Sequence, residues 1–321
     1  METSEPIRHE APPPAMLRAI APLSALTYPG LVWCGVHLSP AFLALSLAVP
    51  AIGLVAAHRA GARGASPLVR WIAHLTVASP PLFAVLGGWL DFQRVVPFDS
   101  LGVWIALWSS LTVAALLDRR LAAPPIRPPR RRLAAAHAMS GAAVALFATA
   151  HLANHLAGLF GGDAHAAVMR VLRAAYRHPL VEPALLAAVG FQVASGAWLL
   201  GSKLRRLPDR FDTLQTATGA YLIIFFASHV SAVLRARLLR HTDTDWTWLA
   251  GGELLSDPWS ARLVPYYFLA VVALPLHLAC GLRAAALARG GSPARPNKLV
   301  LSIAAAALLA SSLILVGLFR A

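Results

Sequence analysis

The chain has 321 residues, of which 58% are hydrophobic and only 13% are charged, and its mean hydropathy is +0.63. These values exclude a soluble globular domain and predict an integral membrane protein. The net charge of +14 would suggest nucleic-acid binding in a soluble protein. In a membrane protein an uneven distribution of arginines between loops explains it, and we expect no nucleic-acid partner.

Stretches of about 20 apolar residues predict membrane-spanning helices, because a helix rises about 1.5 Å per residue and the hydrocarbon core is about 30 Å thick. We predict an all-α, polytopic transmembrane helix bundle of about eight spans, three N-terminal and five in the second half of the chain. In chain order the spans are 31–57, 68–90, 101–117, 133–160, 180–200, 214–234, 263–287 and 299–319.

The first predicted span is the least regular. Pro40 and Pro50 interrupt it, and apolar character extends back to Pro22, which would also suit an extra interfacial or re-entrant piece. The number of crossings before the second bundle depends on this segment.

A segment rich in proline and arginine divides the chain. Residues 122–132 contain the sequence APPIRPPRRR, which is too polar to be membrane-embedded and is typical of a stiff cytosolic linker. We therefore predict an N-terminal three-span membrane region (1–121), whose role the sequence does not indicate, this linker, and a five-helix membrane domain (133–321).

The loops on the same side as this linker hold most of the 28 basic residues but, among the acidic ones, only Asp118, Asp209 and Asp212. The excess of positive charge predicts that this side is cytoplasmic, and with eight spans both termini would lie outside. The first 20 residues lack the pattern of a cleavable signal. We expect an integral protein of a bacterial inner (cytoplasmic) membrane, with the lipid bilayer as its first partner.

The cysteines and small residues restrict the cofactor chemistry. Cys34 and Cys280 both fall within predicted spans, and the chain has no CxxCH sequence, so any haem would be of the non-covalent b type. Small residues that let helices or a flat porphyrin approach closely occur in four pairs: Ser140-Gly141, Ser195-Gly196, Thr218-Gly219 and Cys280-Gly281.

Two histidines in the second half of the chain suggest a shared metal. His151 lies nine residues before Phe160, and His229 lies six before Arg235, in helices predicted to run in the same direction, so their depths differ by about 5 Å. A neutral imidazole in hydrocarbon needs a hydrogen-bonding partner or a metal. We predict one haem iron held between these two rings, about one haem per chain.

Other polar residues in the spans are less clearly paired. His137 is 14 residues before His151, on the same face and about 21 Å away along the helix. Gln192 and His277 have similar, more central depths on descending helices, but glutamine is a poor iron ligand. His277 could instead form a hydrogen bond between helices.

These stretches resemble a known family. The segment from Arg130 to Phe319 is similar to the five-helix, haem b membrane anchor of succinate dehydrogenase and fumarate reductase, the diheme type in a single polypeptide. The matching stretches, in order, are RRRLAAAHAMSG, FATAHLANHL, LQTATGAYLIIFFASHV and YYFLAVVALPLHLACGL.

The resemblance implies roles for individual residues. His151 and His229 stand at the family's first and third ligands, which hold the haem nearer the outside, and His277 stands at the fourth. At the second ligand this chain reads GFQVASG and offers Gln192. The resemblance therefore implies one outer haem and puts an inner haem in doubt.

The implied function is electron transfer between the quinone pool and flavoprotein and iron–sulfur subunits on the cytoplasmic side. The chain has neither a GxGxxG stretch nor clustered cysteines, so we expect no dicarboxylate active site of its own. Glu182, four residues after His178, is the candidate proton relay for a quinol, and His137 could serve an inner quinone. A non-enzymatic redox or quinone sensor built on the same bundle, and a haem-free structural protein, remain as alternatives.

Overall fold

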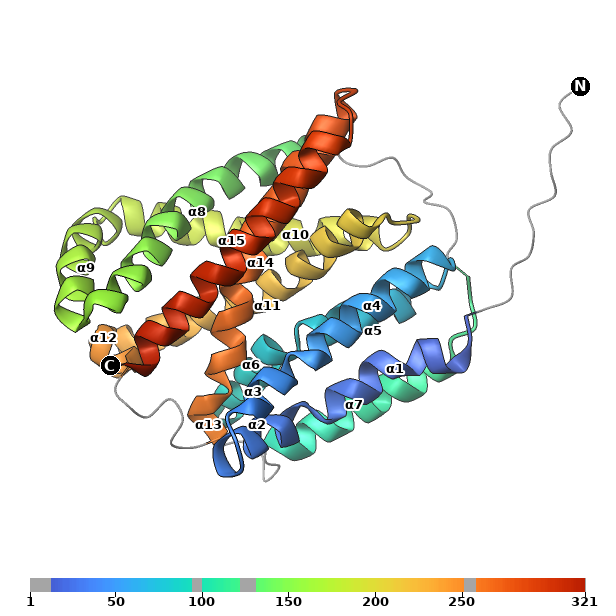
Figure 1. Ribbon diagram of the computed structural model, residues 1–321, viewed down its shortest axis with the longest axis horizontal. Helices are drawn as coiled ribbons and strands as arrows, with labels where there is room; N and C mark the ends of the chain where they lie inside the picture. Colours follow the sequence, from blue (N-terminus) through green and yellow to red (C-terminus); the bar gives the residue numbers. More distant parts are fainter. Residues whose placement is uncertain (1–12, 94–99, 122–130, 251–257, 321) are drawn as a thin grey trace, which may run out of the picture.

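A computed structural model of the chain describes residues 13–93, 100–121, 131–250 and 258–320. Secondary structure in these ranges is helical apart from one isolated β-bridge, between Ala65 and Leu121. The predicted all-α helix bundle is therefore confirmed (Figure 1). Of the predicted linker 122–132, only its last two residues are described, and they begin a helix.

The N-terminal region contains more membrane-length elements than predicted. Those that could cross a membrane are Ala15–His37, Ala41–Ala62 and Ser100–Leu117, together with a pair of helices, Pro67–Val77 and Ser79–Gly88, bent by 75° at their junction. The helices of this region are α1 (Ala15–Leu26), α2 (Tyr28–His37), α3 (Ala41–Ser46), α4 (Ala48–Ala62), α5 (Pro67–Val77), α6 (Ser79–Gln93) and α7 (Ser100–Leu117).

The prediction of one span over 31–57 is wrong. Helix α2 ends at His37 and α3 starts at Ala41, and the two helices pack so closely that a Cβ on Gly35 would lie 2.5 Å from Leu43. Pro40 stands in this connection, where it has no N–H to continue the helix and disfavours helical backbone at the residue before it. The apolar character before the predicted span belongs to a separate membrane-length element, α1 with α2.

Because of this extra element, the first helix starts at the opposite end of the bundle from the one that the predicted eight spans would give. Arg18 in α1 donates hydrogen bonds of 2.8 Å to the carbonyl oxygens of Leu116 and Asp118, at the C-terminal end of α7. The end of α7 directly precedes the arginine-rich segment. The first helix therefore begins at the arginine-rich end, and not at the opposite end as eight spans would require.

The second half of the chain has five membrane-length helices, as predicted: Arg131–Phe160, Val181–Lys203, Arg210–Leu239, Leu263–Ala288 and Ala294–Phe319. Its elements are α8 (Arg131–Ala157), the short η1 (Gly158–Phe160), α9 (Gly162–Tyr176), α10 (Val181–Lys203), α11 (Arg210–Leu239), α12 (Trp246–Ala250), α13 (Pro258–Ala261), α14 (Leu263–Ala288) and α15 (Ala294–Phe319). Helices α14 and α15 cross the others at a steep angle (Figure 1).

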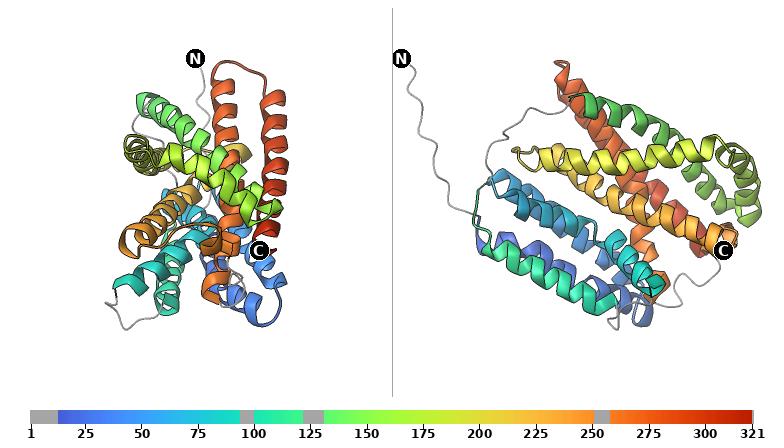
Figure 2. Two further views of the ribbon diagram at one scale, coloured as in Figure 1. Left: turned by 90° about the vertical axis from the view of Figure 1, so that its left-hand side faces the viewer. Right: turned by 180° about the vertical axis from the view of Figure 1, so that it is seen from behind.

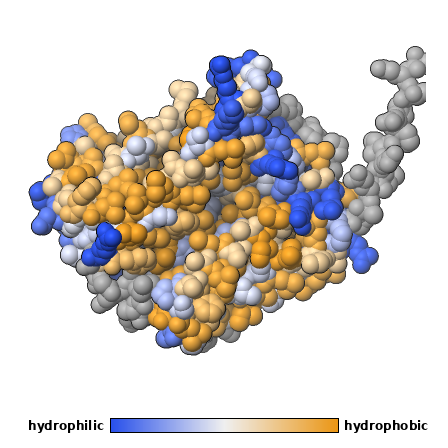
Figure 3. Space-filling view, viewed as in Figure 1, coloured by the Kyte–Doolittle hydropathy of each residue, from blue (hydrophilic) through white to orange (hydrophobic). Residues whose placement is uncertain are grey.

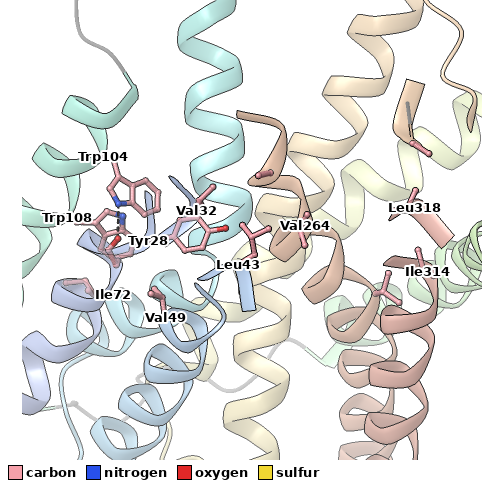
Figure 4. Packing of buried hydrophobic residues seen from close by; sticks show 14 of the residues in the cluster. Tyr28, Val32, Leu43, Val49, Ile72, Trp104, Trp108, Val264, Ile314 and Leu318 are labelled. Atoms are coloured by element: carbon pink, nitrogen blue, oxygen red, sulfur yellow. Dashed lines mark hydrogen bonds between the residues drawn. The ribbon is translucent and has the colours of Figure 1, made fainter. Parts of the chain in front are cut away.

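One hydrophobic core joins the two halves. Trp104 and Trp108 of α7 are fully buried with Tyr28 of α2, and the same cluster reaches Val264 of α14 and Ile314 of α15 (Figure 4). The indole of Trp104 also donates a 2.8 Å hydrogen bond to the carbonyl of Ala25. The N-terminal helices lie along one side of the long C-terminal helices (Figure 2).

A buried arginine fastens the N-terminal region to the second half. Arg70, in the first turn of α5, donates to the carbonyls of Leu204 and Arg206 at 2.5 and 2.7 Å, just beyond the end of α10. This guanidinium satisfies carbonyls that the helix itself leaves without partners. It fixes the arginine-rich ends of the two halves at the same level.

The outer surface suits a lipid environment. Large apolar side chains such as Leu146 and Trp198 are exposed on the bundle. In the face shown in Figure 3, apolar residues cover the middle and hydrophilic residues gather towards the ends. An apolar surface of this extent is expected where lipid, and not water, surrounds the helices.

Candidate functional site

A cavity in the second half lies between α8, α9, α10, α11 and α14, near the end of the bundle opposite the arginine-rich loops. It has a volume of about 260 Å³. His151 and His155 from α8, His229 from α11, Glu182 from α10 and Tyr267 from α14 line it together with leucine, valine and phenylalanine side chains. We call this the outer cavity.

The structure brings the two predicted ligands together. The ring centroids of His151 and His229 are 6.2 Å apart. Two imidazole nitrogens each about 2 Å from a shared metal, with each centroid about 1 Å further back, give a centroid separation of about 6 Å. The centroid separation of these two rings is that of two imidazoles on one metal, but Nε2 of His151 is hydrogen-bonded to His155 in this structure.

Each ring is also held by a phenylalanine one helical turn earlier. Phe147 stacks on His151 with centroids 5.6 Å apart, and Phe225 stacks on His229 at 5.2 Å with an interplanar angle of 8°. The spacing of four residues puts ring and imidazole on one face of each helix. These contacts restrict the rotation of both histidines.

A second histidine of α8, His155, lies within hydrogen-bond distance of His151. His155 Nε2 lies 3.2 Å from His151 Nε2, so the nitrogen of His151 that would bind iron faces His155 here. Iron binding by His151 would replace this hydrogen bond. His155 in turn lies near His165 of α9, with ring centroids 5.5 Å apart.

His165 is a site residue that the sequence analysis missed. It is buried, its Nε2 lies 3.0 Å from the amide nitrogen of Asn154, and burial lowers its pKa. It lies in α9, between two predicted spans where no helix was expected. The amphipathic sequence GDAHAAVMRVLRAAY, with apolar residues at helical spacing, is the signal that could have revealed it.

Glu182 lies in the outer cavity with the predicted ligands and is paired with an arginine of α11. Its carboxylate accepts a 2.5 Å hydrogen bond from Arg237 of α11. The ring of His178, four residues earlier in the chain, accepts a hydrogen bond from the backbone N–H of Leu180 at 3.3 Å. The acid is thus anchored to the helix that carries His229.

A smaller cavity of about 130 Å³ lies nearer the arginine-rich end, between α8, α10, α11 and α14. His137 of α8 and His277 of α14 face each other across it, with ring centroids 6.3 Å apart and an interplanar angle of 81°. Gln192, the counterpart of His277 in the sequence analysis, donates to the carbonyl of His137 at 2.7 Å and to Ser140 Oγ. We call this the inner cavity.

Three of the four small-residue pairs surround the inner cavity, which Gly141, Gly196 and Gly219 help to line. A Cβ on Gly219 would lie 2.9 Å from Cε1 of His277, so only glycine lets this ring lie against α11. The two explanations for these pairs, close helix packing and clearance for a cofactor, therefore both apply to the walls of the inner cavity.

Among the described residues, no group of three or more His, Cys, Asp or Glu side chains is arranged to hold a bare metal ion. Comparisons of the chain with protein-family models, with curated proteins and with solved structures gave no match.

Proposed function

We propose that this chain is a haem b membrane protein that transfers electrons between membrane quinone and partner subunits, in which His151 and His229 would hold an outer haem. The observation that carries the proposal is the 6.2 Å separation of the two rings across the outer cavity. Both ligands come from long helices, which hold a site more rigidly than loops do.

The residues that line the outer cavity support the proposal of a haem. The walls are mainly apolar, and Arg177 and Arg237 are the cations that line it. Guanidinium groups pair well with carboxylates such as the propionates of a porphyrin. When bound, haem iron supplies one-electron chemistry, and the protein sets its potential through axial ligands, hydrogen bonds and burial.

The chain's own residues then have separate tasks. His151 and His229 would hold the haem iron, and Phe147 and Phe225 stack on their rings and orient them. Glu182, on the wall of this cavity, would take up a proton from a quinol bound beside it, because a carboxylate close to the reacting hydroxyl can act as a general base. Arg237 keeps this carboxylate pointed at the cavity.

The similarity to the membrane anchors of succinate dehydrogenase and fumarate reductase supports partners of the same classes. We propose flavoprotein and iron–sulfur subunits docked on the arginine-rich, cytoplasmic side of a bacterial inner membrane. The dicarboxylate chemistry would belong to those subunits, and this chain would conduct electrons.

A redox or quinone sensor built on the same bundle is the second candidate. It is favoured by the N-terminal helices, which Arg70 ties to the end of α10 and which could pass a change in this bundle to a partner. Co-purification separates the two functions: flavin and iron–sulfur subunits support the conduit, and a signalling protein supports the sensor.

The ligand assignment is tested by purifying the full chain in detergent and measuring haem by pyridine haemochrome with reduced-minus-oxidised spectra. His151→Ala and His229→Ala should each lose the same haem component. His155→Ala should retain it, and His178→Ala, at the surface of the same end, is the control for removing a histidine. A wild-type chain without haem would refute the proposal, and loss of the component in His155→Ala but not in His151→Ala would overturn the choice of ligand on α8.

A further inference from the structure

We infer that α9 is an interfacial helix, which lies in the head-group region of the outer leaflet and binds phospholipid with the sides that face away from the bundle. Acyl chains contact an apolar face of α9, and a lipid phosphate contacts Arg170. The inference goes beyond the proposed function and is independent of it, because it rests on this helix and on none of the proposed haem ligands.

Helix α9 is too short to cross the membrane. It has 15 residues and is therefore about 22 Å long, against a hydrocarbon core of about 30 Å. It lies at the same end of the bundle as α12 and the end of α15, and it makes a steep angle with α10 (Figure 1). The chain turns into it at Gly161, whose φ of +104° is a conformation that residues with a side chain rarely adopt.

Contacts with neighbouring elements fix the orientation of α9. Trp246 of α12 packs against its first turn, where a Cβ on Gly162 would lie 3.0 Å from the indole. Arg173 donates hydrogen bonds of 3.1 Å to the carboxylate of Asp243 and 2.9 Å to the carbonyl of Thr244. The direction in which each face of the helix points is therefore set by the fold.

The side chains of α9 form separate faces at helical spacing. The face towards the bundle forms one wall of the outer cavity and consists of His165, Met169, Leu172 and Tyr176. A polar face carries Asp163, Arg170 and Arg177, which are seven residues apart and so lie on one side of the helix.

A third face is apolar and exposed. Val168, Val171 and Ala175 have the spacing i, i+3, i+7 and share one side; Val168 is 37% exposed and Val171 is 73% exposed. Phe160, just before the helix, and Leu180, just after it, are 84% and 77% exposed. A single exposed apolar residue is ordinary, but a whole apolar face with apolar residues at both ends needs a covering partner.

A bilayer surface fits this division into faces. Interfacial helices bury an apolar side about 5–10 Å into the boundary between head groups and acyl chains, and they carry basic residues on the polar side. Helix α8, on which α9 packs, already exposes apolar residues such as Leu146 to lipid. The apolar face of α9 continues this lipid-facing surface to the end of the bundle.

Arg170 supplies the charge for a lipid phosphate. It is exposed and directly precedes Val171 in the chain, whereas Arg173 is engaged with Asp243 and Arg177 lines the outer cavity. A guanidinium group forms strong charge-assisted hydrogen bonds with phosphate, and its long stem can extend to the level of the head groups. Lipid thus contacts the outside of the helix whose inside forms a wall of the outer cavity.

The test uses the full chain in phospholipid nanodiscs, with Cys34 and Cys280 replaced by serine and a nitroxide on one new cysteine at a time. Val168→Cys, Val171→Cys and Ala175→Cys report on the apolar face, and Asp163→Cys on the polar face of the same helix is the matched control. Leu146→Cys, on α8, verifies that the chain is inserted.

Electron paramagnetic resonance compares collisions of each label with oxygen, which concentrates in acyl chains, and with a charged nickel chelate, which stays in water. We expect the three labels of the apolar face to lie about 5–10 Å below the lipid phosphates and the label at Asp163→Cys to lie in water.

The contact with phosphate is tested by adding Arg170→Glu or Arg170→Lys to Val171→Cys. The label should become shallower with glutamate, because like charges repel, and keep its depth with lysine. An unchanged depth with glutamate would refute the role of Arg170.

Two results would overturn the interfacial placement. Access of the nickel chelate to all four labels of α9 would show that the helix projects into water. Low access of both reagents to the three labels of the apolar face would show that protein, such as a second copy of the chain, covers it. None of these measurements depends on haem, so the proposed function is tested separately.

Discussion

At the scale of single residues, the ion pair between Glu182 and Arg237 brings an acid into a mainly apolar cavity. The carboxylate side chain is 27% exposed and its partner 21% exposed, so both are partly shielded from solvent. A carboxylate in this position needs a compensating cation, and Arg237 provides it from the helix that carries His229. The pairing makes Glu182 a fixed group close to the proposed quinol site.

Glu182→Gln should slow the reduction of the outer haem by quinol by about 10²-fold, because the amide keeps the shape but cannot take up the proton. Stopped-flow absorbance with a short-chain quinol measures this rate, and the haem content should be unchanged. Asp163→Asn, an exposed acid in the first turn of α9, is the matched control. An unchanged rate in Glu182→Gln would exclude the relay.

At the scale of elements, three helices of the N-terminal region are fastened together at the arginine-rich end. Ser66 caps α5 by accepting from the N–H of Val69, and it donates a 2.7 Å hydrogen bond to Asp118 beyond the end of α7. Arg18 of α1 binds the carbonyl of Asp118. One short segment thus receives contacts from α1 and α5 as well as from α7.

This junction predicts a dependence of stability on pH. The hydrogen bond from Arg120 lowers the pKa of Asp118 to about 2, below its value in an unfolded chain. A lowered folded pKa stabilises the protein above the unfolded value near pH 4 and loses this effect as pH falls towards 2.

Asp118→Asn should therefore lower the melting temperature at pH 7, by an amount corresponding to about 1 kcal/mol, because the arginine that pairs with this carboxylate is exposed to solvent. The difference from the wild type should shrink between pH 4 and pH 2. Thermal unfolding followed by tryptophan fluorescence measures both effects, with Asp163→Asn as the control. A difference that does not change with pH would show that the charge of Asp118 is not responsible.

At the scale of the whole molecule, the additional element formed by α1 and α2 changes the orientation of the chain. The start of α1 lies beside the end of α7, and α15 ends near η1, at the other end of the bundle, where a Cβ on Gly317 would lie 3.3 Å from the backbone of Leu159. If every membrane-length element crosses the bilayer, α1 begins on the cytoplasmic side and α15 ends outside.

Labelling of single cysteines with a membrane-impermeant maleimide tests this orientation in intact cells, after Cys34 and Cys280 are replaced by serine. Arg320→Cys should be labelled from outside, and Ala15→Cys only after the membrane is opened. Ser292→Cys, in the connection between α14 and α15, should behave like Ala15→Cys and serves as the control. Labelling of Ala15→Cys in intact cells would restore the eight-span orientation.

The sequence by itself determined the all-α class, the five long helices of the second half and the similar depth of His151 and His229. Hydropathy, charge and residue spacing are local properties, and in a bilayer every backbone group must be satisfied within a helix, so apolar length directly predicts a span. Depth follows from counting residues along a helix of known rise. The arginine-rich loops predicted in the same way which end of the bundle is cytoplasmic.

Only the tertiary structure decided which helices are neighbours and which faces they share. It divided the predicted first span at Pro40, brought His137 opposite His277, turned Gln192 towards α8 and placed His165 beside His155. Small residues, hydrogen bonds and shape set the rotation of each helix and its choice of partner in a bundle. These interactions join residues far apart in the chain, so hydropathy and spacing along one helix do not specify them.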